Sequence, residues 1–175
     1  MTKKLMTTAV NNSYYNTREY YTITTEKYLV QLTGGSIKFY DRAANRLLAT
    51  IRGFSYLYTG AVKPDETELM ALEKGKHFYI FSLDDFQQRK KVTIPYGCWS
   101  MDVLGAFSDD GKVLHIPVIK RDRKGVKSFF ICHYTTDEYT LIRMDPISYK
   151  EYQAKWEWIS RAFRLSKTCN IVPNV

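Results

Sequence analysis

The sequence predicts a mainly β protein in which three groups of four short antiparallel strands precede one amphipathic α-helix. The first supporting observation is that runs of aromatic and β-branched residues alternate with turn-forming residues along most of the chain. The second is that part of the sequence recurs in altered form, and the third is that the hydrophobic period becomes helical near the C-terminus. A length of 175 residues corresponds to one domain.

The recurring stretch is AVKPDETELMAL, which begins at Ala61 and returns as AFSDDGKVLHIP at Ala106. Strand-like segments that end in isoleucine also recur, as RLLATI, RKKVTI and EYTLI. The intervals vary between 40 and 50 positions while the order of features is kept, which is typical of loop insertions in a repeat. We therefore expect three copies, at about residues 18–52, 53–97 and 98–146.

Each copy contains four strand-like runs. They are YYTIT, YLVQL, SIKFYD and RLLATI in the first copy; SYLYTGAV, ELMALE, HFYIFSL and RKKVTI in the second; and WSMDVLGAF, VLHIPVIK, KSFFICHY and EYTLIRM in the third. Turn residues such as Gly34-Gly35, Lys74-Gly75 and Asp109-Asp110 separate the runs and tolerate the backbone of short hairpin loops. Each copy is thus predicted to be a four-stranded antiparallel meander, and repeated meanders of this length are typical of propeller blades.

The segment GAVKPDETELMALEKGKHFYIFSL resembles a blade of the WD40 family, because a Pro-Asp turn and a glycine turn separate its strands. NRLLATIRGF resembles the outer strand of that family, and the resemblance covers about residues 20–144. The signature dipeptides differ: Gly53-Phe54 stands at the Gly-His position, and Tyr40-Asp41, Ser82-Leu83 and His133-Tyr134 stand at the Trp-Asp position. The resemblance implies three propeller-like blades. The alternative fold is a β-sandwich or barrel with a C-terminal helix.

Three blades do not close a propeller, since known rings contain about four to eight. We expect two open faces, each a row of apolar side chains, which a second copy would cover in a six-bladed homodimer. The competing explanations are a larger ring completed by a partner and a chain that is a fragment of a longer propeller. The N-terminal segment is a candidate to add a strand or to cover an edge, since it contains Tyr14, Tyr15, Tyr20 and Tyr21.

After Pro146 the pattern predicts a helix over about residues 149–165. Ser148 and Glu151 match a capping box, and Ile147 and Tyr152 match a hydrophobic staple. The helix has an apolar stripe that would either dock on the β domain or bind a partner; its candidate partner-binding residues are Tyr152, Trp156, Ile159 and Phe163. The expected organisation is a β domain at 1–146, a helical segment at 147–167 that packs on it, and a tail at 168–175.

The formal net charge of +8 favours an acidic partner such as nucleic acid. The densest basic run lies in the second hairpin of the third copy, and its candidate polyanion-binding residues are Lys120, Arg121, Arg123, Lys124 and Lys127. Charged hairpin tips also discourage pairing between strand edges, which is the structural alternative.

Three cysteines, Cys98, Cys132 and Cys169, favour a reducing compartment. The N-terminus lacks the apolar region of a signal peptide, and no window approaches the roughly 18 apolar residues of a membrane span. We therefore expect a cytoplasmic protein that does not bind membranes.

No segment predicts a catalytic residue, a metal site or a cofactor. Cys132 and His133 are adjacent in a strand, so their side chains should point to opposite faces and not share an ion. Nucleophilic catalysis by Cys98 would need a histidine close in space. The pairs Asp84-Asp85 and Asp109-Asp110 fall in predicted turns, where Asp hydrogen-bonds the backbone.

The function that the sequence favours is a non-enzymatic protein-protein interaction module or scaffold, with homodimerisation as the way to complete the ring. The alternative is a nucleic-acid or polyanion binding protein that uses the 120–127 hairpin. A hydrolase with carboxylates at the blade centre is the third hypothesis. Charge reversal at Arg121 and Arg123 distinguishes the first two, because only polyanion binding depends on these cations.

Overall fold

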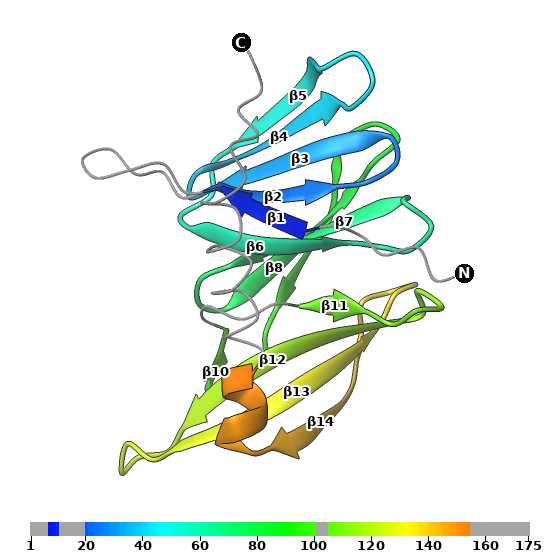
Figure 1. Ribbon diagram of the computed structural model, residues 1–175. Coiled ribbons are helices and arrows are strands. Elements are labelled where there is room, and N and C mark those ends of the chain that lie inside the picture. The colour runs from blue at the N-terminus through cyan, green and yellow to red at the C-terminus, as the bar shows by residue number, and fades with distance from the viewer. Residues whose placement is uncertain (1–6, 11–19, 101–104, 155–175) are drawn as a thin grey trace, which may run out of the picture.

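The computed structural model describes residues 7–10, 20–100 and 105–154, and within these ranges the fold consists of three antiparallel sheets and one short helix (Figure 1). Sheet 1 contains β1 (Thr7–Val10), β2 (Tyr20–Thr24), β3 (Tyr28–Thr33), β4 (Ser36–Asp41) and β5 (Arg46–Arg52). Sheet 2 contains β6 (Leu57–Val62), β7 (Glu68–Glu73), β8 (His77–Ser82) and β9 (Gln88–Thr93). Sheet 3 contains β10 (Cys98–Trp99), β11 (Ala106–Phe107), β12 (Val113–Arg121), β13 (Lys127–Thr135) and β14 (Leu141–Ile147).

The predicted fold class, mainly β with three antiparallel sheets and a C-terminal helix, is confirmed. Each expected copy supplies the strands of one sheet, in chain order from the first strand to the fourth. The N-terminal segment adds a fifth strand, β1, to sheet 1. In the third copy the expected first strand is divided into β10 and β11, both of which pair with β12.

The three sheets are stacked, and sheet 2 lies between the other two (Figure 1). One buried cluster joins sheet 1 to sheet 2 and includes Val30, Phe39, Leu69 and Phe81. A second cluster joins sheet 2 to sheet 3 and includes Met70, Ile80, Ile116 and Cys132. Neighbouring residues of β7 and β8 face opposite clusters, so both faces of these two strands are buried and their sequences are mostly apolar.

The second and third strands pair in the same register in all three sheets when counted from the β-bulge in the third strand. This register identifies equivalent residues of the three sheets without the use of sequence similarity. In each sheet one residue pair of the second and third strands faces the C-terminal direction of the stack: Val30 with Phe39, Met70 with Ile80, and His115 with His133. The first two pairs pack on the following sheet, and the third lies on the outer face of sheet 3. The adjacent pair faces the opposite direction: Gln31 with Lys38 on the outer face of sheet 1, and Ala71 with Tyr79 and Ile116 with Cys132 toward the preceding sheet. The three sheets therefore repeat one arrangement of strands.

The turn between the third and fourth strands repeats as well. In this turn Asn45, Phe86 and Tyr139 have positive φ angles of 49°, 58° and 50°. The two strands that the turn connects also shift register by a β-bulge in each sheet. Phe86 packs on the preceding sheet, with its ring centroid 4.8 Å from that of Phe39. Tyr139 of sheet 3 packs on sheet 2 in the same way, and its ring centroid lies 6.4 Å from that of Phe78. Asn45 is exposed, and no sheet precedes sheet 1 in the described part of the chain, so an aromatic ring at this position would have no sheet to pack on.

The two outer faces of the stack contain apolar side chains, as expected, but a polar pair interrupts each of them. On sheet 1 the Gln31 and Lys38 pair stands where the inner sheets have apolar pairs. Leu29 and Tyr40 form an apolar pair beside it. On sheet 3 the position equivalent to Met70 and Ile80 holds two histidines. Polar end faces are what a terminal repeat needs when no further repeat covers it.

The C-terminal helix occupies 149–154 of the described residues and begins as predicted. The backbone N–H of Glu151 donates to Ser148 Oγ at 3.2 Å, and the N–H of Ser148 donates to Glu151 Oε2 at 2.7 Å, which completes the capping box. Tyr152 is 6% exposed and packs on the outer face of sheet 3 with Ile119 and Phe129. Trp156, Ile159 and Phe163 lie outside the described residues. No helix in the described part of the chain is long and apolar enough to cross a membrane.

Candidate polyanion-binding surface

The antiparallel order of the strands separates the turns into two ends of the stack. Turns between first and second strands, and between third and fourth strands, lie at one end. Turns between second and third strands lie at the opposite end, together with the connections from one sheet to the next. We name the first the acidic end and the second the basic end, because the charges of the described turns divide in the same way.

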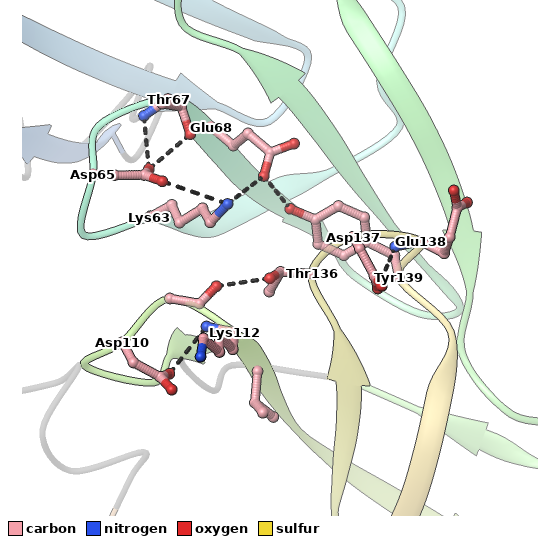
Figure 2. Close-up of polar contacts among 12 residues, drawn as sticks. Lys63, Asp65, Thr67, Glu68, Asp110, Lys112, Thr136, Asp137, Glu138 and Tyr139 are labelled. Carbon is pink, nitrogen blue, oxygen red and sulfur yellow. Dashed lines mark hydrogen bonds and ion pairs between the residues drawn. The ribbon is translucent and has the colours of Figure 1, made fainter.

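The turns of the acidic end contain more carboxylates than cations. Their carboxylates are Glu26, Asp65, Glu66, Asp84, Asp85, Asp109, Asp110, Asp137 and Glu138, and their cations are Lys27, Arg42, Lys63 and Lys112. Several of these carboxylates hydrogen-bond their own turn (Figure 2). Asp65 Oδ1 accepts from the N–H and the hydroxyl of Thr67, at 3.1 and 2.7 Å. Asp110 Oδ1 accepts from the N–H of Lys112 at 3.0 Å and from Ser108 Oγ at 2.6 Å.

These contacts explain Asp65 and Asp110 as turn residues, which is the role that the repeat predicts for them. The Ser108 hydroxyl and the Lys112 N–H favour the ionised form of Asp110 and hold the pKa of that carboxyl below its usual value of 3.8. A different carboxylate, Glu68, links two sheets: Tyr139 Oη donates to its Oε2 at 2.7 Å, and Lys63 Nζ lies 3.5 Å from the same atom (Figure 2). Burial is the main cause that raises the pKa of the Tyr139 hydroxyl, and the hydrogen bond to the Glu68 carboxylate raises it further.

The basic end is dominated by the hairpin of β12 and β13, whose nine-residue strands project beyond the other turns of that end (Figure 1). The five candidate cations predicted from the sequence lie together along its tip, and all five are exposed: Lys120, Arg121, Arg123, Lys124 and Lys127. Asp122 is the one carboxylate of the tip. Its Oδ1 accepts from the N–H groups of Lys124 and Val126, both at 2.8 Å, so it closes the turn.

The turn between β7 and β8 adds two exposed cations to this end, Lys74 and Lys76. It is fixed beside sheet 3 because Gly75 and Ser100 exchange backbone hydrogen bonds of 3.0 and 2.8 Å. The neighbouring Glu73 is 7% exposed and is directed inward, where it accepts from the N–H of Ser55 and from Tyr79 Oη, each at 2.9 Å. Its carboxylate therefore does little to neutralise the cations at the surface.

Two aromatic residues that sequence reasoning did not single out lie beside the part of this hairpin that is next to its tip. Tyr96 is 101% exposed and sits between Pro95 and Gly97, in a turn closed by a 3.0 Å bond from the N–H of Cys98 to the carbonyl of Pro95. Trp99 is partly buried in sheet 3, and the guanidinium of Arg121 lies 5.7 Å from its ring centroid. The signal available in the sequence is an aromatic residue enclosed by turn-forming Pro and Gly.

The histidines and cysteines of sheet 3 lie on opposite faces, as the alternation of a strand requires. His115 and His133 face outward with their Nδ1 atoms 2.8 Å apart, and His133 Nε2 lies 3.0 Å from Asp145 Oδ2. Cys98 and Cys132 are buried against sheet 2, and burial raises the pKa of the Cys132 thiol to about 12. The structure thus does not bring a cysteine and a histidine of this sheet together. No group of three or more His, Cys, Asp or Glu side chains placed to hold a metal occurs among the residues described.

No family model matches the chain, and no curated protein matches it. Among solved structures, hydrazine synthase from Kuenenia stuttgartiensis is similar at 13% identity with a TM-score of 0.39. That alignment covers 69% of this chain and 46% of the other, so this chain spans less than half the length of the matched one.

Proposed function

We propose that this protein is a non-enzymatic binding module of propeller-like architecture that binds a polyanion at its basic end. The observation that carries the proposal is the separation of charge: the carboxylates gather in the turns of one end, whereas the longest hairpin of the other end carries five exposed cations. A chain that used surface charge for solubility alone would have no need to divide the two signs between its ends.

The hairpin suits such a partner because its cations are accessible and its tip is shaped by backbone bonds. Lysine and arginine side chains that reach phosphates contribute binding that does not depend on sequence. The tip does not need to fold on binding, since Asp122 already fixes the turn. Interaction through the helix has less support, because the one described residue of its partner-binding set, Tyr152, is buried on its own sheet.

Binding of fluorescently labelled single-stranded DNA and of inorganic polyphosphate, measured by anisotropy in low salt, tests the proposal. We expect both to bind, and the double variant Arg121→Glu with Arg123→Glu to weaken binding by on the order of 10-fold or more. The matched control is Lys27→Glu with Arg46→Glu, which lowers the net charge equally but replaces exposed cations of the acidic end. Equal losses in both double variants, or no binding by the wild type, would refute polyanion binding at this surface.

A further inference from the structure

We infer that the polyanion is a single-stranded nucleic acid and that Tyr96 is the platform on which one of its bases stacks. The inference rests on the proposed function and concerns the same surface. It starts from the complete exposure of Tyr96, which exceeds that of the other exposed large hydrophobic side chains in the described part of the chain, the next being Tyr149 at 61%.

The backbone holds Tyr96 in place. The bond from the Cys98 N–H to the Pro95 carbonyl makes Tyr96 and Gly97 the two central residues of a turn, and Gly97 has a φ of 76°, which a glycine adopts without strain. Pro95 restricts the chain on the other side. Because the backbone of this turn is already fixed, it loses little conformational freedom when a base stacks on the ring. The free energy of stacking is therefore not offset by the cost of ordering the loop.

Cations of the hairpin lie directly beside this turn. Cys98 is the register partner of Lys120, and the Lys120 Cε atom lies 3.9 Å from the position that a Cβ on Gly97 would take. The next residue of the hairpin, Arg121, extends over the ring of Trp99. The side chain of Lys120 therefore adjoins the turn that carries the exposed ring, with spacing set by the β10–β12 ladder, and Arg121 lies one residue further along the same strand.

This combination distinguishes between polyanions. A strand with unpaired bases offers phosphates to the cations and a base face to the ring, whereas a duplex keeps its base faces stacked and polyphosphate has none. A purely acidic chain such as poly-glutamate would use the cations but offers the tyrosine ring no aromatic or branched apolar side chain. The exposed Tyr96 is thus explained by single-stranded nucleic acid and left unexplained by the other polyanions.

The test compares binding of an oligothymidylate, a DNA duplex, inorganic polyphosphate and poly-glutamate to wild type, Tyr96→Ala, Tyr96→Phe and Val126→Ala. We expect Tyr96→Ala to weaken oligothymidylate binding by about 5- to 100-fold and to leave polyphosphate binding unchanged. Tyr96→Phe should retain the wild-type affinity because it keeps the ring. Val126→Ala, which removes an exposed apolar side chain from the same hairpin, should change nothing.

The outcomes separate the inference from the proposed function. Equal binding of single strand, duplex and polyphosphate, with no effect of Tyr96→Ala, overturns base stacking but leaves polyanion binding intact. Preferential binding of poly-glutamate overturns the inference in favour of an acidic protein partner. Failure of every polyanion to bind overturns the proposed function as well. Because Tyr96 is fully exposed, its variants should unfold at the wild-type temperature, and that measurement excludes misfolding as the cause of a loss.

Discussion

His115 and His133 face each other across β12 and β13 with their Nδ1 atoms 2.8 Å apart, at the register position that Met70 and Ile80 occupy in sheet 2. In sheet 2 that position is buried against the next sheet. In sheet 3 no further sheet follows in the described part of the chain, and the same position holds imidazoles, one of which lies 3.0 Å from Asp145. The exchange of an apolar pair for a polar one marks sheet 3 as a terminal sheet.

The first prediction is that the protein is monomeric. A face-to-face dimer would have to cover Lys38 on sheet 1 or the Asp145 carboxylate on sheet 3, and taking such charges out of water costs free energy unless the second copy supplies opposite charges. Light scattering after size exclusion should give the monomer mass of 20.5 kDa at micromolar concentrations. A mass twice as large would show that the stack is completed by a second copy.

The second prediction concerns the same face. The double variant His115→Met with His133→Ile copies the pair of sheet 2 and converts part of the outer face into an apolar patch. We expect this variant to fold and to self-associate at concentrations at which the wild type is monomeric, because exposed apolar patches are covered by association. Unchanged sedimentation behaviour of the variant would mean that the histidines do not protect this face.

The third prediction concerns packing around β6. A Cβ placed on Gly60 would lie 2.6 Å from the carbonyl oxygen of Met70 in the neighbouring strand β7 and 3.2 Å from Leu32 Cδ2 in sheet 1, so Gly60→Ala requires the backbone of β6 or β7 to shift. We expect it to lower the free energy of unfolding by about 1–3 kcal/mol. The control is Gly34→Ala, whose added Cβ would meet Tyr56 at an ordinary 3.8 Å. Equal urea midpoints for the two variants would contradict the predicted crowding at Gly60.

The fourth prediction concerns the loss of folding stability at low pH. The pKa of Asp110 is lowered in the folded state, first by the Ser108 hydroxyl and then by the Lys112 N–H. The stability that follows is present above the unfolded value of 3.8 and is lost as pH falls through the lower folded pKa. Asp110→Asn keeps an acceptor for the turn but does not titrate. Urea unfolding at pH 7 and near pH 3 should show a smaller loss of stability for the variant than for the wild type; an identical loss would remove Asp110 from the acid response.

Local signals in the sequence predicted much of the fold. The Gly34-Gly35 pair lies between β3 and β4, and Ser148 with Glu151 forms the capping box, because both features depend on residues close together in the chain. β1 could not be predicted in the same way. Its run TTAV is short, and its strand conformation depends on pairing with β2 rather than on a pattern of its own.

The candidate site was predicted in part. The cations from Lys120 to Lys127 form a dense run, so composition was enough to find them. Tyr96 and the separation of charge depend on which turns share an end of the stack, and that follows only when the strand order is known. The polar outer faces were missed for a similar reason: Gln31 and Lys38 become informative only beside their register equivalents in sheet 2.

The salt dependence of binding tests the central claim, that the basic end binds polyanions by neutralising their charge. With four or five phosphates contacted, the affinity for labelled single-stranded DNA should fall on the order of 100-fold between about 50 and 200 mM salt. The variant Arg121→Glu with Arg123→Glu should show a shallower dependence, because it releases fewer counterions. An affinity that stays constant over this range, or a slope that the variant does not change, would contradict the claim.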